Sequence, residues 1–289
     1  MPLEYLDRIK RLVVIAMFSD DDLMNRLVLK GGNAIDLIYR VSTRASLDVD
    51  FSLESEFEED ELEIIEKKIF KVLDETFWEA GFKVFDIEFM QRPSRIKEEV
   101  EGFWGGYKIE FKVIPKDEFE KSSGNIEALR RNATVIGPRQ GKKFKVDISK
   151  FEYCKGKQKE DLDGYTIYVY SPEMLVIEKI RAICQQMPEY KEIIKTMTAS
   201  PRPRDFFDIF ILMDSFSIDL NFPANLDMVT GMFAAKKVPL ALLGNIRKYR
   251  EFHREGFDAL KDTVTPDAKI KKFDFYFDYV VDEVEKLKF

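Results

Sequence analysis

The chain has 289 residues, which is enough for one large domain or two smaller ones. Its net charge of −7 argues against a nucleic-acid-coating protein. Its two cysteines, Cys154 and Cys184, form no CxxC motif, which argues against a zinc site and a disulfide framework. No apolar run reaches transmembrane length and the N-terminal residues lack a cleavable-signal pattern, so we expect a cytoplasmic protein that binds no membrane.

Hydrophobic periodicity predicts a mixture of helices and strands over the first 170 residues. In chain order the predicted elements are a helix at 4–18, a helical stretch that leads into Leu27–Lys30, a helical stretch at 33–39, a strand at 46–53, an acidic helix that ends at Gly81, strands at 82–90 and 106–114, a helix or long excursion at 117–132, and strands at 143–151 and 165–170.

Residues 171–289 have mainly helical periodicity, and Ser171-Pro172-Glu173 is a typical helix start. The expected fold class is therefore α/β (α+β), a mixed sheet flanked by helices and followed by a helical C-terminal region. We predict two domains, residues 1–170 and 171–289. The single histidine, His253, lies in a charged helical stretch and is expected at the surface, which argues against a histidine-based metal site or a Ser-His-Asp triad.

Two aspartates share one face of the predicted strand at 46–53. Apolar and polar residues alternate along this strand, which places Asp48 and Asp50 side by side on its polar face. Two such carboxylates can hold one or two hard divalent cations through oxygen ligands. The alternative is an ordinary solvated strand face.

A third carboxylate on a neighbouring strand usually completes a site of this kind. Asp147 in the strand at 143–151 and Glu110 in the strand at 106–114 both fall on the polar face of their strand. Periodicity does not choose between them, and Asp147 could instead be an exposed acid paired with a lysine.

Gly31 and Gly32 connect two of the predicted helical stretches. Without Cβ atoms, their backbone can approach a ligand closely and present N–H groups to phosphate oxygens, although the pair could equally be a simple bend. Lys179 lies at the edge of an apolar helical stripe, so its ammonium should reach either a cleft or the surface.

The segment around residue 204 combines charges at helical spacing. Arg204 and Asp208 stand one helical turn apart and would form an i,i+4 ion pair, while Asp205 falls in the first turn of a helix, where an acid is favourable. A purely structural role for all three residues is an open alternative.

Residues 139–159 contain a local excess of basic side chains, which are Arg139, Lys142, Lys143, Lys145, Lys150, Lys155, Lys157 and Lys159. On an acidic protein this excess could steer a polyanionic acceptor such as RNA, or it could be a solvated lysine-rich loop.

Four short motifs occur in order between residues 25 and 215: Leu29-Lys30-Gly31-Gly32-Asn33-Ala34-Ile35, Arg44-Ala45-Ser46-Leu47-Asp48-Val49-Asp50-Phe51, Glu178-Lys179-Ile180-Arg181-Ala182, and Arg202-Pro203-Arg204-Asp205-Phe206-Phe207-Asp208. Together they resemble the motifs of the nucleotidyltransferase AbiEii/AbiGii toxin family, a branch of the polymerase-β-like nucleotidyltransferases. Asn33 departs from the family's usual Thr or Ser, and an asparagine can still donate a hydrogen bond to a phosphate.

The resemblance implies a metal-dependent nucleotidyltransferase and assigns roles to named residues. Mg²⁺ or Mn²⁺ would be held by Asp48, Asp50 and Asp147, which the resemblance favours over Glu110 as the third acid. The implied nucleotide-binding residues are Gly31, Gly32, Asn33, Ser46, Lys179 and Arg204. The implied catalytic residues are Asp48, Asp50, Asp147, Lys179 and Asp205.

The resemblance also implies the reaction and its setting. A nucleoside monophosphate would pass from an NTP, with GTP among the donors, to an acceptor, with tRNA or another RNA among the acceptors. The protein would be the toxin of a toxin–antitoxin or phage-defence pair and would bind a cognate antitoxin. Two alternatives stay open, a non-catalytic relative that binds a nucleotide or a protein, and a metal-independent hydrolase that uses Asp147 with Asp48 or Asp50 as acid and base.

Overall fold

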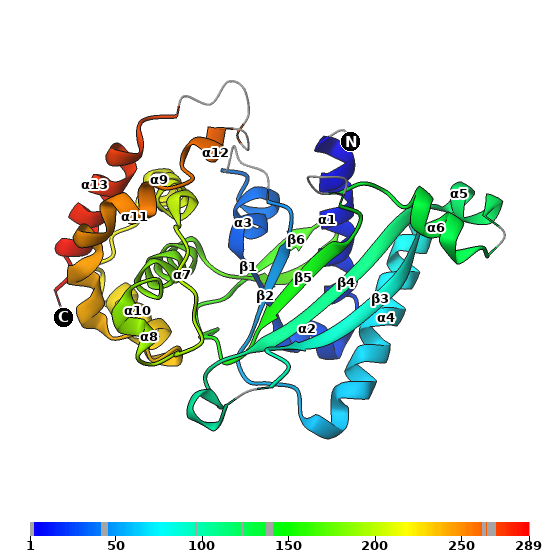
Figure 1. The fold of residues 1–289 in the computed structure, drawn as a ribbon, viewed down its shortest axis with the longest axis horizontal. Helices are drawn as coiled ribbons and strands as arrows, with labels where there is room; N and C mark the ends of the chain where they lie inside the picture. The colour runs from blue at the N-terminus through cyan, green and yellow to red at the C-terminus, as the bar shows by residue number, and fades with distance from the viewer. Residues whose placement is uncertain are drawn as a thin grey trace.

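The computed structural model describes residues 3–41, 46–95, 97–122, 124–136, 141–261, 264 and 270–288. Its centre is a seven-stranded sheet with the strand order β3-β4-β5-β2-β1-β7-β6 (Figure 1). The strands are β1 (Leu27–Lys30), β2 (Val49–Leu53), β3 (Phe82–Arg92), β4 (Gly106–Pro115), β5 (Phe144–Ser149), β6 (Gln158–Leu162) and β7 (Tyr165–Val169).

The sheet is mixed, as the sequence predicts. Strand β2 runs parallel to β5 and antiparallel to β1, and β1 runs parallel to β7. The pairs β3–β4, β4–β5 and β6–β7 are antiparallel. Strands β2 and β5 are therefore direct neighbours in the sheet, although a large part of the chain separates them.

One face of the sheet is covered by two long helices, α1 (Leu3–Phe18) and α4 (Leu62–Glu79), which Figure 1 shows behind the strands. The ring of Phe18 contacts that of Phe51 on β2, with 5.9 Å between centroids, and Phe77 contacts Phe111 on β4 at 5.8 Å. Because successive residues of a strand point to opposite faces, the acids that alternate with these apolar residues lie on the other face.

The remaining elements before residue 170 are short. They are α2 (Asp21–Arg26), α3 (Gly31–Asn33), a π-helix (Ala34–Ile38), 3₁₀ turns (Glu59–Glu61 and Glu98–Val100), α5 (Lys116–Lys121) and α6 (Ile126–Asn132). The predicted excursion at 117–132 is thus two helices, and the predicted acidic helix is α4 with a 3₁₀ turn before it.

The C-terminal helices gather at the left of Figure 1, beside the sheet. They are α7 (Pro172–Cys184), α8 (Pro188–Lys191), α9 (Pro203–Phe216), α10 (Pro223–Ala235), a 3₁₀ helix (Leu240–Tyr249), α11 (Arg250–Arg254), α12 (Asp258–Lys261) and α13 (Phe273–Glu285). The predicted start of α7 is confirmed, because the Ser171 hydroxyl accepts the backbone N–H of Met174 at 3.3 Å.

The strands of the sheet all end by Val169, and α7 begins at Pro172. The hydrophobic core is continuous through both parts of the chain, from Leu6 to Val284. The division into two domains near residue 170 stays a prediction. Within the described residues, no helix combines the length and the apolar composition that crossing a bilayer requires.

Two expectations from the sequence are wrong, and one strand was missed. Leu27–Lys30 is strand β1 rather than the end of a helix, and β6 was not predicted. His253 is fully buried rather than at the surface. Its Nδ1 atom accepts the backbone N–H of Arg202 at 3.2 Å, and burial lowers its pKa to about 4, so the ring is neutral at neutral pH.

Candidate active site

Asp50 and Asp147 are register partners on the two neighbouring parallel strands β2 and β5. The same row of the sheet continues to Lys30 on β1, which is the partner of Asp50, and to Lys108 on β4, which is the partner of Asp147. Residues in one row point to the same face, and neighbouring strands lie about 4.8 Å apart. The two carboxylates therefore stand side by side on the face away from α1 and α4, with a lysine on either side.

Asp48 lies one residue before β2, on the same face as Asp50, and is exposed. The Nδ2 atom of Asn33 donates a hydrogen bond of 2.6 Å to the backbone carbonyl of Asp48. Asn33 itself is fully buried, so in this structure it fixes the backbone at Asp48.

Burial and the charge of neighbouring carboxylates raise the pKa values of Asp50 and Asp147. Burial is the main cause that raises the pKa of Asp50 to about 7; the Lys30 ammonium opposes it, and the carboxylates of Asp147 and Asp48 add to it. The pKa of Asp147 is raised by burial first and by the charge of Asp48 second. Asp50 and Asp147 are thus both affected by the negative charge of neighbouring acids.

The chemistry of Asp48, Asp50 and Asp147 fits a hard divalent cation, because each of the three offers carboxylate oxygens as ligands. Within the described ranges, no three acidic, histidine or cysteine side chains already converge in a metal-binding geometry. Asp50 and Asp147 are held by strand pairing, whereas Asp48 is exposed at the start of β2 and its side chain can turn. Closing an ion site here would therefore require the three carboxylates to draw closer together.

Glu110, the other candidate for the third acid, lies in the next row of the sheet, opposite Lys145. Its carboxylate is bound by Lys108 at 2.6 Å and by Lys143 at 2.8 Å. These hydrogen bonds lower its pKa to about 2. Because Glu110 is already neutralised by two lysines, the geometry favours Asp147 as the partner of Asp50.

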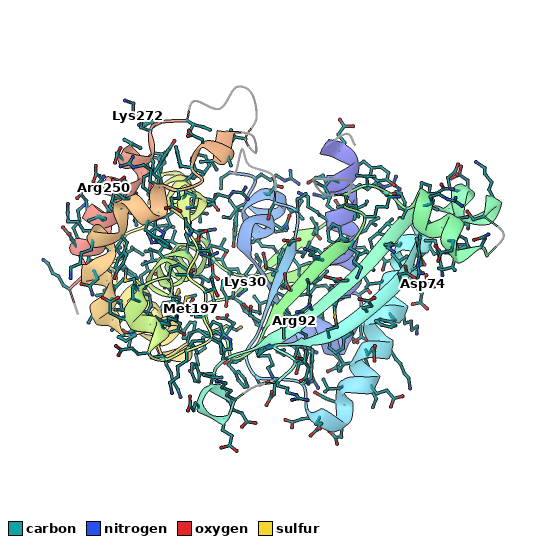
Figure 2. All side chains as sticks on the ribbon, in the orientation of Figure 1. Lys30, Asp74, Arg92, Met197, Arg250 and Lys272 are labelled. Atoms are coloured by element: carbon teal, nitrogen blue, oxygen red, sulfur yellow. The ribbon has the colours of Figure 1, made fainter. Side chains whose placement is uncertain are left out.

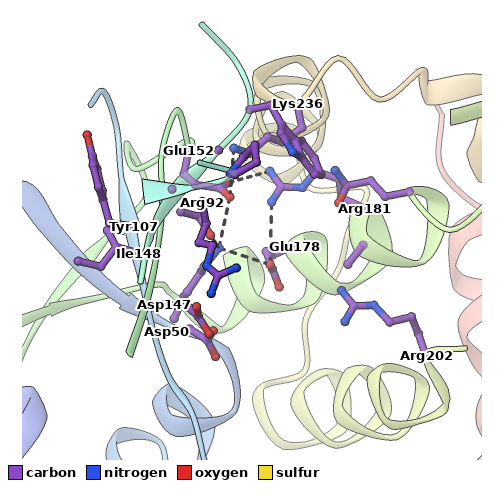
Figure 3. Close-up of a pocket in the computed structure, with 18 residues that line it drawn as sticks. Asp50, Arg92, Tyr107, Asp147, Ile148, Glu152, Glu178, Arg181, Arg202 and Lys236 are labelled. Atoms are coloured by element: carbon purple, nitrogen blue, oxygen red, sulfur yellow. Dashed lines mark hydrogen bonds and ion pairs between the residues drawn. The ribbon is translucent and has the colours of Figure 1, made fainter. Parts of the chain in front are cut away.

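Two cavities meet at Asp50, between the sheet and the C-terminal helices. The larger cavity, of about 790 Å³, is lined by Gly31, Gly32, Ser46, Lys179, Arg204 and Asp205. The smaller cavity, of about 490 Å³, is lined by Asp147, Arg92, Trp104, Glu152, Arg181 and Lys236 (Figure 3). Lys30, Asp50, Ser149, Glu178 and Arg202 line both cavities. The described part of the chain thus brings most of the predicted site residues together, apart from Asn33 and Asp48, which line neither cavity.

Lys179 is part of a buried ion cluster. Its ammonium donates to Asp205 Oδ1 at 3.0 Å and to Asp208 Oδ2 at 2.8 Å, which fastens α7 to α9. The predicted i,i+4 pair between Arg204 and Asp208 is wrong, because Asp208 is buried and binds Lys179. Arg204 instead lines the larger cavity.

A second buried ion cluster was not predicted from the sequence. Glu152 is 4% exposed and lies 2.9 Å from Arg181, 3.3 Å from Lys30 and 3.5 Å from Lys236. Figure 2 shows Lys30 between the strands and the C-terminal helices, and Glu178 lies 3.7 Å from its ammonium. These groups belong to segments far apart in the chain, so no local pattern could have found the cluster.

Several basic residues of the segment 139–159 are already used within the fold. Lys143 binds Glu110, and the buried Lys150 binds Glu56 at 2.6 Å. The local excess of positive charge is therefore smaller than the sequence suggests. Arg139 of this segment, and Arg44 of the second motif, lie outside the described residues.

The fold is that of nucleotidyltransferases. MenT4, a nucleotidyltransferase toxin from Mycobacterium tuberculosis, superposes with a TM-score of 0.53 at 14% sequence identity, covering 98% of this chain and 84% of that one. JHP933 from Helicobacter pylori superposes with a TM-score of 0.51 at 15% identity, covering 98% and 90%. At these identities the likeness concerns the fold alone.

The chain belongs to the AbiEii family, described as "Nucleotidyl transferase AbiEii toxin, Type IV TA system", which matches residues 13–279. This membership confirms the resemblance carried by the four motifs. Among curated proteins, the chain has no match.

Proposed function

We propose that this protein transfers a nucleoside monophosphate from an NTP to an acceptor hydroxyl, with Mg²⁺ or Mn²⁺ bound at Asp48, Asp50 and Asp147. The observation that carries the proposal is the register pairing of Asp147 with Asp50, the acid that borders both cavities. Membership of a nucleotidyltransferase toxin family supports it.

Different residues would perform different parts of the reaction. Gly31, Gly32 and Arg204 would hold the phosphate chain of the donor, since they line the larger cavity. The acceptor hydroxyl oxygen would attack the α-phosphorus, the bond from that phosphorus to the β-phosphate oxygen would break, and pyrophosphate would leave. Asp147 would orient the hydroxyl and take its proton at a carboxylate oxygen. A bound divalent cation would supply charge neutralisation for the phosphoryl oxygens.

Lys179 and Asp205 enter the proposal as a pair. Lys179 lines the larger cavity while its ammonium is held by Asp205 and Asp208. Asp205 would thus fix the lysine beside the phosphate chain, and Ser46, which lines the same cavity, would add a hydroxyl donor.

The proposed setting follows the family. The protein would act in the cytoplasm as the toxin of a toxin–antitoxin pair, with a role in phage defence, and a cognate antitoxin would neutralise it. GTP would be among its donors and tRNA or another RNA among its acceptors.

The proposal is tested by incubating the protein with each α-labelled NTP, total RNA and Mg²⁺, and measuring label in the RNA. We expect transfer with the wild type and none with Asp50→Asn or in EDTA. The matched control is Asp163→Asn, which removes an acid from the β6–β7 turn, where it pairs with Arg11. Asparagine tolerates the left-handed backbone at that position, where φ is 55°. Unchanged transfer by Asp50→Asn, or in EDTA, would contradict the proposal.

Replacing Gly31 with alanine is expected to abolish transfer with a modest loss of stability. Gly31 has a φ of +72°, and an added Cβ would lie 2.5 Å from Asp50 Oδ2, so the carboxylate would have to move. The left-handed backbone alone should lower the free energy of unfolding by about 1–2 kcal/mol. Urea unfolding and the labelled transfer assay measure the two effects.

Gly81→Ala is the matched control for Gly31→Ala. Gly81 has a φ of +87°, and an added Cβ there would meet nothing within 4 Å. Both variants should lose a similar amount of stability, whereas only Gly31→Ala should lose transfer. Full activity in Gly31→Ala would show that the close approach to Asp50 does not matter.

A further inference from the structure

The two cavities differ in which part of the proposed reaction they contact. Asp50 borders both cavities, Asp147 borders only the smaller one, and the Gly31–Gly32 pair borders only the larger one. A hydroxyl that gives its proton to Asp147 must therefore enter through the smaller cavity. A phosphate chain that contacts the glycine pair must enter through the larger cavity.

We propose that the two cavities separate the two substrates: the larger cavity takes the NTP, and the smaller cavity takes the terminal nucleotide of a single-stranded acceptor, bound by Arg92 and Trp104. This inference rests on the proposed transferase function and names the acceptor-binding residues of the same site.

Arg92 supplies an exposed cation at the smaller cavity. It ends β3 opposite Gly106, and Gly106 in turn lies opposite Ser149 of β5. Because Gly106 has no side chain, the Arg92 side chain can lie across β4, and Figure 3 shows it on the same side of the cavity as Asp50 and Asp147. Within the described ranges its guanidinium has no ion-pair partner. A planar guanidinium free to form two hydrogen bonds is suited to a phosphate group.

Trp104 supplies an aromatic surface at the same cavity. It is half-buried, and its ring is tilted against that of Tyr190 with 6.5 Å between centroids, so it is supported from one side. Nucleobases stack on accessible aromatic side chains irrespective of the base sequence. A base on Trp104 and a phosphate on Arg92 would place one nucleotide unit in a cavity of about 490 Å³.

In this arrangement the transfer runs from one cavity to the other across Asp50. The acceptor hydroxyl loses its proton to Asp147 and forms the new bond to the α-phosphorus, and pyrophosphate leaves into the larger cavity. Lys30 and Arg202 border both cavities, where Lys30 is paired with Glu152 and Glu178 and Arg202 is paired with Asp205.

A crossed mutational design tests the inference. With a short single-stranded oligoribonucleotide as the acceptor, Arg92→Gln and Trp104→Leu should each raise the acceptor KM by about tenfold. Both should leave the Kd of a non-hydrolysable NTP analogue, measured calorimetrically, unchanged. Arg204→Gln, in the larger cavity, should do the reverse. Unfolding curves of all three variants identify any loss of fold, and Arg92→Lys should recover part of the acceptor affinity.

The outcomes separate this inference from the function on which it rests. A wild type that transfers no label contradicts the proposed function itself. A wild type that transfers label, with Arg92→Gln and Trp104→Leu both unaffected, overturns only the acceptor site. Weaker binding of the NTP analogue by Arg92→Gln would assign the cavities the other way round. Transfer to a protein side chain with unchanged KM in both variants would also overturn the inference.

Discussion

Asp147→Asn is expected to lower the rate of nucleotidyl transfer by about a thousandfold or more, which corresponds to about 4 kcal/mol of transition-state stabilisation. Asp147 is the register partner of Asp50. It borders only the smaller cavity, whereas Asp50 borders both cavities. An asparagine keeps the size of the side chain but can neither take the acceptor's proton nor carry charge. The measurement is single-turnover transfer from a labelled NTP, with circular dichroism to confirm that the fold is retained.

Glu110→Gln is the matched control for this prediction. Glu110 lies on the neighbouring strand β4, points to the same face and carries the same charge, but it is bound by Lys108 and Lys143 and lines neither cavity. It should keep transfer near the wild-type rate. If Glu110→Gln were inactive and Asp147→Asn active, the third acid would be Glu110.

Glu152→Gln is expected to lower the free energy of unfolding by about 3–5 kcal/mol, because it leaves buried cations without their counter-charge. Arg181, Lys30 and Lys236 all lie within 3.5 Å of the Glu152 carboxylate, and all are buried. The network joins β1, the segment after β5, α7 and the end of α10, so its loss loosens the contact between the sheet and the C-terminal helices. Urea unfolding at neutral pH measures the effect.

The same carboxylate makes stability depend on pH. Its pKa in the folded protein lies well below the usual value, because the charges of Arg181, Lys30 and Lys236 outweigh the cost of burial. Its contribution is therefore fully present above the unfolded pKa of about 4.5 and is lost as the pH falls below that value. Glu152→Gln should show a weaker loss of stability on acidification than the wild type.

Glu63→Gln is the control for the buried network. Glu63 pairs with Lys67 at 2.5 Å on the surface of α4, where both side chains are more than 70% exposed. Its substitution should leave the unfolding midpoint unchanged, since exposed ion pairs contribute little. Equal midpoints for Glu152→Gln and wild type would show that the buried network does not stabilise the fold.

The parts of the site that depend on strand periodicity could be predicted from the sequence. Alternation places Asp50 on the polar face of β2 and Asp147 on the polar face of β5, and the structure has both strands. Periodicity does not show which strands are paired in the sheet, so it could not choose between Asp147 and Glu110. That choice depends on β5, rather than β4, lying next to β2.

The errors have physical causes that are equally specific. Strand β1 is buried on both faces, so Leu27–Lys30 shows an apolar run without alternation, which does not distinguish a strand from a helix. His253 stands among charged neighbours in the sequence, yet its ring packs against Phe206 with 5.3 Å between centroids. Glu152 was missed because its partners come from segments that meet only in the folded chain.

Parallel pairing of β2 with β5 makes the acid pair a product of late folding. Asp50 leaves the ribosome long before Asp147, and contacts between such distant segments form slowly because a large loop must close first. The helices that carry Lys179 and Arg204 emerge later still. A growing chain therefore holds only part of the proposed active site during synthesis, which would keep the activity silent until most of the polypeptide has been made.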